Sequence, residues 1–286
     1  MSIPAAMSHA TPASHSLPPV RRLDVLHPLR WLALGWRDMA RAGVISFAHG
    51  LALSLFGALI MLVARDRFWL MAGALSGFMV VAPVLATSLY ALSRAIERGE
   101  PTGWPVVVRT WLSWQRSHQD KLGNDYWCLV QFGSLLALAA TGWVLTSAAL
   151  ITLLAPVPIH TPLDFVRHVV LDDGGWLFEA WLALGGLMAA PIFASSVVAM
   201  PLLLDRRVGL RQAVLTSWQC VLVNPLPMAL WAGLIMGFTL LGLASLLLGL
   251  IAVMPMLGHA SWHAYRDLVD VSGLPSRDAA AREGAR

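Results

Sequence analysis

The sequence predicts an all-α membrane protein, with six transmembrane helices in a bundle. Three observations predict this fold class. The chain is 57% hydrophobic and only 13% charged, whereas about 25% of the residues of a soluble domain are charged. Its apolar residues gather in runs of at least ~20, the length that crosses ~30 Å of hydrocarbon. Its basic residues fall almost entirely into alternate loops between these runs, as they do in multi-pass membrane proteins.

Both ends of the chain are expected to be disordered cytoplasmic tails, at 1–28 and at 271–286. The N-terminal tail is rich in Ser, Pro, Ala and His, a composition that buries too little apolar surface to fold. It lacks the apolar core of a secretory signal peptide, so we expect no cleavage there. The membrane domain is therefore expected to occupy 29–270.

Four spans follow directly from uninterrupted apolar runs. The first two are separated by the short external turn Arg65-Asp66-Arg67, and the next two by a longer external loop with several Pro and Asp residues. The fourth span stops at Asp205-Arg206-Arg207. The expected spans are 44–64, 68–92, 126–154 and 176–204.

The last apolar region is too long for one span. From Leu226 to Tyr265 there are 40 residues without Asp, Glu, Lys or Arg. A single helix of that length would measure about 60 Å, roughly twice the hydrocarbon thickness. Two short helices joined by a turn near 241–245 fit better, and they bring the number of spans to six.

The distribution of charge supports six spans and fixes their orientation. With six spans, 17 of the 20 Lys and Arg residues lie on one side of the membrane, and with five spans only 13 would. Loops rich in Lys and Arg stay in the cytoplasm, so both termini are expected there. The three exceptions are Arg65, Arg67 and Arg167.

An amphipathic helix is expected before each odd-numbered span, at 29–41, 108–116 and 210–222. In the first, Leu29, Leu32, Ala33, Trp36 and Ala40 share one face, and Arg30, Arg37 and Arg41 share another. A Trp- and Leu-rich face beside a basic face is typical of a helix lying in the membrane interface. The alternative is a cytoplasmic helix packed against the base of the bundle.

The same segments suggest a threefold internal repeat. A Trp followed by a polar residue occurs in each amphipathic segment, and a Pro followed one or two residues later by Leu occurs in each even-numbered span. The units would be 29–92, 105–204 and 209–268, with the prolines at equivalent depth. The residues concerned are Trp36-Arg37, Trp114-Gln115, Trp218-Gln219, Pro83, Pro201 and Pro255.

Several short motifs resemble a family of bacterial integral membrane proteins, domain of unknown function 2189. The resemblance covers about 29–270 and implies a bacterial inner-membrane location but no activity; the segment 116–120 departs from the family pattern. The motifs are Trp31-Leu32, Gly35-Trp36-Arg37-Asp38, Ser93-Arg94, Glu97-Arg98-Gly99-Glu100-Pro101, Met200-Pro201-Leu202-Leu203-Leu204-Asp205-Arg206, Gly258-His259-Ala260 and Trp262-His263-Ala264-Tyr265-Arg266-Asp267-Leu268.

Some members of that family carry the label of cytochrome c oxidase components, so a metal or haem site is weighed as an alternative. His259 and His263 are four residues apart and share a helix face, and His49 is the only other histidine at similar depth. The simpler interpretation is that the pair ends the last span and bonds to backbone carbonyls or Asp267. We expect no metal and no cofactor.

The functional expectation is a non-enzymatic membrane scaffold or interaction module. No catalytic motif is present, and the span centres almost lack ionisable residues, which disfavours an ion-coupled pump. The alternatives are a transporter or channel for a small neutral or hydrophobic solute and a redox protein. The expected partners are membrane lipids, or another membrane protein, and not nucleic acid. The scaffold would present a cytoplasmic polar cluster of Trp36, Arg37, Arg94, Glu97, Arg98, Asp205, Arg206, His259 and Arg266.

Overall fold

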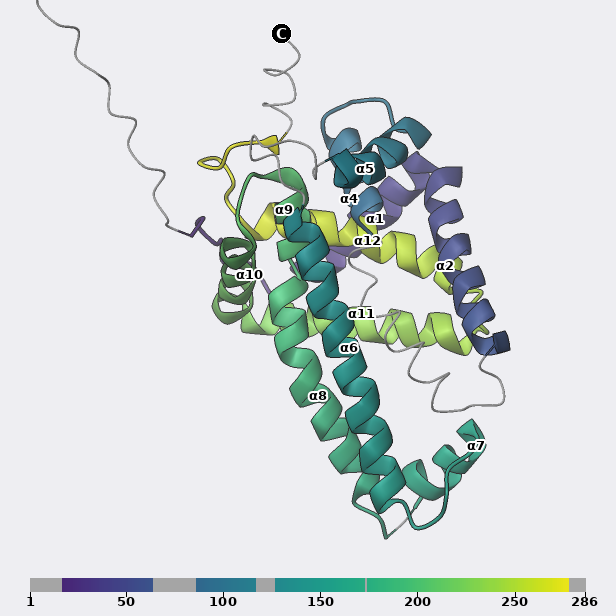
Figure 1. Ribbon diagram of the computed structural model, residues 1–286. Helices are drawn as coiled ribbons and strands as arrows, with labels where there is room; N and C mark the ends of the chain where they lie inside the picture. The colour runs from purple at the N-terminus through teal and green to yellow at the C-terminus, as the bar shows by residue number, and fades with distance from the viewer. Residues whose placement is uncertain (1–16, 64–85, 117–126, 173, 278–286) are drawn as a thin grey trace, which may run out of the picture.

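The computed structural model describes residues 17–63, 86–116, 127–172 and 174–277 (Figure 1). The regular secondary structure in these ranges is helical, and they contain no strand. Two isolated β-bridges, Val20 to Val269 and Arg206 to Ser276, are the extended pairings that they contain. The all-α fold class is therefore confirmed.

Twelve helical elements are present in the described part of the chain. They are α1 (His27–Ala42), α2 (Val44–Val63), α4 (Thr87–Glu97), α5 (Trp104–Arg116), α6 (Trp127–Leu154), α7 (Pro162–Phe165), the π-helix η1 (Val166–Val170), α8 (Leu177–Ser196), α9 (Ala199–Asp205), α10 (Leu210–Val223), α11 (Pro225–Ala244) and α12 (Leu250–Leu268).

Four of the described helical segments are long and apolar enough to cross a membrane. They are Val44–Val63, Cys128–Leu154, Leu177–Asp205 and Pro225–Ala244. The second predicted span, 68–92, lies mostly outside the described residues. The sixth coincides with α12, which has 19 residues but carries two histidines, an arginine and an aspartate in its second half. The described residues therefore contain four candidate spans, and the full count of six stays a prediction.

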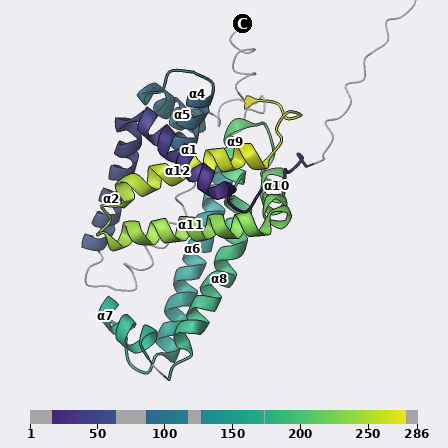
Figure 2. The same ribbon diagram turned by 180° about the vertical axis from the view of Figure 1, so that it is seen from behind.

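The long helices form two hairpins that point in different directions. In Figures 1 and 2, α6 and α8 run steeply side by side, whereas α11 and α12 run across the view in a different direction. The short helices α9 and α10 connect the two hairpins. The tip that joins α6 to α8 lies far from α4, α5 and the end of α12 (Figure 1).

α12 is the centre of the fold, because α1, α2 and α4 all pack against it. Glycines permit the closest crossings. A Cβ added at Gly35 of α1 would lie 2.6 Å from the Met256 carbonyl oxygen, and one at Gly50 of α2 would lie 2.6 Å from the Ile251 carbonyl carbon. Small residues at such crossings let helix backbones approach in a membrane, where packing drives association.

The three predicted amphipathic segments are helices, but α1 packs through a different face from the one expected. Its buried residues include Trp31, Gly35 and Asp38, whereas Trp36 is 56% exposed. The reason is that α12 approaches α1 closely, and Gly35 accommodates that approach where a larger side chain would not. The predicted apolar face therefore stays open beside the basic one.

The inner parts of both predicted tails are attached to the helices. The backbone N–H of Arg21 donates to the Leu268 carbonyl, and the N–H of Asp270 donates to the Pro19 carbonyl, each at 2.9 Å. Arg277 is buried and donates from Nε to the Leu203 carbonyl at 2.6 Å. The helix ends leave carbonyls without intrahelical partners, and these neighbouring segments supply donors. The predicted tail boundaries at 28 and 271 therefore assigned to disordered tails some residues that pack against the helices.

The repeat is not established by the described residues. Pro83 lies outside them, so the threefold comparison of depths stays a prediction. Pro201 stands in the first turn of the short helix α9, whereas Pro255 lies inside the continuous helix α12.

Candidate functional site

The second half of α12 carries polar side chains toward the ends of four other helices. Residues three and four apart on a helix share a face, so His259 and His263 point to one set of neighbours. Trp262 and Arg266, also four apart, point to a second set. The neighbours are the end of α1, the start of α2, and the ends of α4 and α9.

The first set is a buried chain of hydrogen bonds centred on Ser93 of α4. Its hydroxyl oxygen lies 2.8 Å from Asp38 Oδ2 and 2.7 Å from His259 Nδ1. On the other side of the imidazole ring, Nε2 lies 2.8 Å from the Ser46 hydroxyl. Asp38, Ser46, Ser93 and His259 are all buried, so α1, α2, α4 and α12 are joined through groups that water does not reach.

The directions of these bonds follow from the number of protons available. The Ser93 hydroxyl donates its one proton to the Asp38 carboxylate, so it can only accept from His259 Nδ1. The opposite nitrogen, Nε2, then accepts from the Ser46 hydroxyl. This arrangement satisfies every member with a neutral imidazole that carries its proton on Nδ1, and it requires no charge on the buried ring.

Asp38 also accepts a hydrogen bond from His263 Nε2 at 2.8 Å. Burial by itself would raise the pKa of this carboxyl, but the hydrogen bonds from His263 and Ser93 hold its pKa below the usual value. Those bonds therefore stabilise the ionised form of Asp38. His49 has a separate pair of partners, the Ser88 hydroxyl and the Ile45 carbonyl, at 2.8 and 2.7 Å.

We predict that Asp38 makes the protein less stable in acid. A carboxyl whose folded-state pKa is lowered contributes stability above its unfolded pKa of about 3.9, and that stability is lost as pH falls through the lower folded-state value. The thermal unfolding midpoint in detergent should therefore drop more steeply below about pH 4 in the wild type than in Asp38→Asn. The exposed Asp24→Asn serves as the control and should retain the wild-type slope. Equal slopes for Asp38→Asn and wild type would contradict the assignment.

Asp205, at the end of α9, is the centre of a second cluster. Its side chain is 2% exposed and accepts a hydrogen bond from the Tyr265 hydroxyl at 2.8 Å. Three guanidinium groups face this carboxylate. Arg206 Nε lies at 2.9 Å, Arg98 Nη2 at 3.4 Å and Arg94 Nη1 at 3.8 Å. A buried carboxylate needs such partners, because an uncompensated buried charge is strongly destabilising.

Glu97, the last residue of α4, binds side chains on the same face of α12. Trp262 Nε1 donates to Glu97 Oε2 at 2.9 Å, and Arg266 donates to Oε1 through Nε at 3.0 Å. In the same last turn of α12, Asp267 accepts a hydrogen bond from Trp31 Nε1 of α1 at 2.9 Å. Each of these bonds joins two helices that are distant in sequence.

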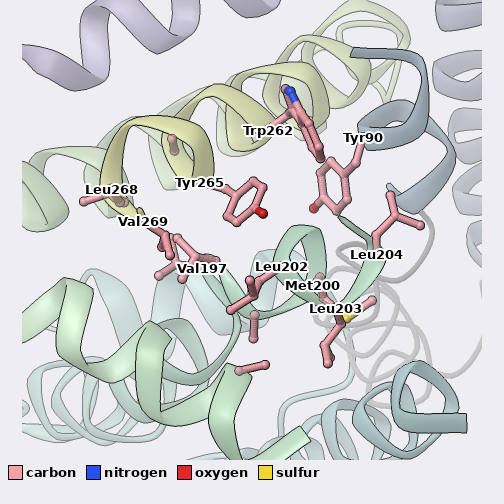
Figure 3. Close-up of a cluster of buried hydrophobic side chains, with 14 of the residues drawn as sticks. Tyr90, Val197, Met200, Leu202, Leu203, Leu204, Trp262, Tyr265, Leu268 and Val269 are labelled. Atoms are coloured by element: carbon pink, nitrogen blue, oxygen red, sulfur yellow. The ribbon is translucent and has the colours of Figure 1, made fainter. Parts of the chain in front are cut away.

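An apolar layer packs against these polar groups. Figure 3 shows Tyr265 and Trp262 extending from α12 toward Tyr90, with the α9 residues Met200, Leu202 and Leu203 beside them. The Trp262 and Tyr265 rings meet edge to face, with centroids 5.3 Å apart. Such pairs contribute roughly 0.5–1.5 kcal/mol beyond the area that they bury.

We call this whole arrangement the helix-end network. It joins the ends of α1, α2, α4, α9 and α12 through side-chain hydrogen bonds and ion pairs. Its members are Trp31, Asp38, Ser46, Ser93, Arg94, Glu97, Arg98, Asp205, Arg206, His259, Trp262, His263, Tyr265, Arg266 and Asp267.

Most of the polar residues named from the sequence lie in this network, but two do not. Trp36 and Arg37 are exposed on α1, on a face away from α12. The other seven have partners within the network. They are Arg94, Glu97, Arg98, Asp205, Arg206, His259 and Arg266.

The three histidines considered as metal ligands have different partners. His259 contacts two serines, His263 contacts Asp38, and His49 contacts Ser88. In the described ranges, no three His, Cys, Asp or Glu side chains form a group that could hold a metal ion. Asp267, one of the two partners expected for the histidine pair, accepts a hydrogen bond from Trp31 instead.

An apolar cavity of about 670 Å³ lies next to the network. Tyr90 and Ser261 form its wall nearest the network, and α6, α8 and α11 form the remainder. We call it the inner cavity. Its lining includes Trp143, Trp181, Gly186, Ile192, Trp231 and Ile235.

Comparison with known protein families gives a match to the central part of the chain. The family model described as "Predicted integral membrane protein (DUF2189)" matches residues 70–205, so the resemblance drawn from the sequence motifs is confirmed over those residues. The motifs at 31–38 and 258–268 lie outside the match. No curated protein and no solved structure matches the chain.

Proposed function

Residues 70–205 of this chain belong to the DUF2189 family of predicted integral membrane proteins. From this premise we propose that the protein is a non-enzymatic scaffold of the bacterial inner membrane. The scaffold holds a set of helix ends in a fixed arrangement at the cytoplasmic side. It offers the exposed side of α1 to another membrane protein.

The proposed topology is six spans with both termini in the cytoplasm. The 17 to 3 distribution of basic residues supports it. So does the position of the helix-end network, which gathers Arg94, Arg98, Arg206 and Arg266 at one end of the molecule. Four cations in one region are stabilised on the side where anionic lipid headgroups and water meet.

The observation that carries the scaffold proposal is the mutual pairing of the polar residues. Asp205, His259, Glu97 and Asp38 have partners in neighbouring helices. Groups committed in this way hold helices together and are not presented to a substrate. Trp36 and Arg37 are among the aromatic and charged residues left exposed, and both lie on the outer face of α1.

Native mass spectrometry of the full chain in membrane-derived nanodiscs tests the proposal. We expect a specific protein partner to remain bound to the wild type and to be lost from the double variant Trp36→Ala with Arg37→Ala. The matched control is Leu222→Ala, which alters an exposed apolar side chain on α10 and should keep the partner. Wild-type spectra that contain lipid but no protein partner would contradict a scaffold role.

The inner cavity favours a second candidate, a carrier or channel for a small apolar solute. Apolar pockets of 300–1,000 Å³ are typical of small-molecule sites, and this cavity falls within that range. The same spectra discriminate the two candidates. A solute site predicts a bound apolar molecule of low mass that is lost from Gly186→Phe, since Gly186 lines the cavity and an added Cβ there meets no other atom within 4 Å. Retention of that molecule by Gly186→Phe would contradict the solute site.

A further inference from the structure

The segment between α6 and α8 contains helices, although the sequence analysis predicted only an external loop there. Asp164 Oδ2 accepts from the backbone N–H of Thr161 at 2.9 Å, and the Thr161 hydroxyl accepts from the N–H of Asp164 at 3.1 Å. This reciprocal pattern is a capping box, which starts a helix. α7 and η1 follow without a break.

One face of this segment is packed onto the end of the α6–α8 hairpin. Val169 is buried against Ile151 and Leu177, and Phe165 packs against the same group. The Phe165 and Trp181 rings meet edge to face, with centroids 5.4 Å apart. The segment is therefore held in one orientation relative to two membrane-spanning helices.

The opposite face exposes large apolar side chains. Leu163 is 53% exposed, and Val166 and Leu171 are also exposed, as is Trp176 just before α8. Arg167 and His168 are exposed beside them. In Figures 1 and 2, α7 extends sideways from the tip of the hairpin and does not continue along its axis.

The position of the segment decides what covers this face. Both of its ends are tethered to helices that cross the hydrocarbon, so it lies at the level of the lipid headgroups. Glu179 is exposed in the first turn of α8. A carboxylate at this position requires contact with water, so water reaches at least this depth. At that level, apolar side chains beside Arg, with a Trp at the border, are the pattern of a helix lying in the interface.

We propose that residues 162–172 and Trp176 lie in the membrane interface at the external side. Leu163 and Val166 reach the acyl chains, Arg167 and His168 face lipid phosphates, and Trp176 sits at the headgroup border. The occupant of the exposed face is thus phospholipid. Because the other face is fixed to Ile151 and Leu177, this contact sets the depth of the α6–α8 hairpin. The choice of leaflet rests on the proposed topology, but the lipid contact does not.

Spin labels on the full chain test this proposal. The parent is the variant Cys128→Ala with Cys220→Ala, and single cysteines replace Leu163 or Val166. His160 and Asp172, exposed positions in the same loop, carry the matched control labels. The chain is reconstituted in vesicles of phosphatidylethanolamine and phosphatidylglycerol, and each label is relaxed with oxygen or with a water-soluble nickel complex. Unfolding midpoints equal to that of the parent establish that each labelled chain is folded.

We expect labels at 163 and 166 to respond several-fold more to oxygen than to nickel, and labels at 160 and 172 to show the reverse. Equal nickel access at all four positions would overturn the proposal, because the face would be in water. Protection from both reagents at 163 and 166 would also overturn it, because protein would cover the face. The topology is tested separately with the nickel complex sealed inside right-side-out vesicles. Relaxation of the control labels at 160 and 172 by this internal nickel would show that the topology is inverted.

Discussion

Replacing Gly50 by leucine is expected to prevent the protein from folding stably. At this position α2 crosses α12, and an added Cβ would lie 2.6 Å from the Ile251 carbonyl carbon and 2.8 Å from its Cα. Backbone atoms cannot move aside as a flexible side chain can. Overpacking of this kind costs about 1–3 kcal/mol or more, and separating the helices would also break the bond between Ser46 and His259.

The yield of monodisperse protein after detergent extraction, with its thermal unfolding midpoint, measures this effect. Gly233→Leu in α11 is the matched control, because an added Cβ there meets no atom within 4 Å. We expect near wild-type yield from the control and little or none from Gly50→Leu. Similar yields from the two variants would show that α2 and α12 do not cross at Gly50.

Removing the carboxylate of Asp205 is expected to have the second large effect. Asp205→Ala leaves Arg94, Arg98 and Arg206 facing each other at the end of α9 without the carboxylate that they share. Breaking a buried ion pair by deleting one partner costs about 3–5 kcal/mol. The unfolding midpoint should fall steeply, and Asp205→Asn should lie between the alanine variant and the wild type because the amide oxygen can still accept from Tyr265.

Asp270→Ala is the control for this prediction. Asp270 is partly exposed and pairs with Arg21 at 3.7 Å near the surface, where an ion pair contributes about 0–1 kcal/mol. Its unfolding midpoint should stay close to that of the wild type. If Asp205→Ala were no more destabilising than Asp270→Ala, the Asp205 cluster would not stabilise the fold.

The helical fold class and four apolar spans could be predicted from sequence, because long apolar runs are a local signal that needs no knowledge of packing. The packed face of α1 could not. Hydrophobicity assigns Trp36 to the buried face, yet Gly35 and Asp38 are the residues that are buried. Gly35 lies against the backbone of α12, and Asp38 accepts a hydrogen bond from His263 of α12. That choice depends on a partner more than 200 residues away in the sequence.

The polar cluster could be predicted as a set but not as a set of pairs. Glu97, Asp205 and Arg266 are conspicuous at the ends of apolar runs, and the motif runs also contain Asp38 and Ser93. Spacing along α12 indicates which of its residues share a face, but it does not identify the side chains opposite. The assignment of His263 to Asp38, and not to Asp267, required the crossing of α1 and α12.

We infer that the motif residues stabilise the fold by pairing across helices, and a double-mutant cycle between Tyr265 and Asp205 tests this pairing most directly. The free energy of unfolding is measured for wild type, Tyr265→Phe, Asp205→Ala and the double variant under the same conditions. Groups in direct contact show coupling energies of about 0.5–3 kcal/mol, and the bond of 2.8 Å between the Tyr265 hydroxyl and Asp205 predicts a favourable value in this range. Additive effects, with a coupling energy within about 0.3 kcal/mol of zero, would contradict the claim that this pair joins α12 to α9.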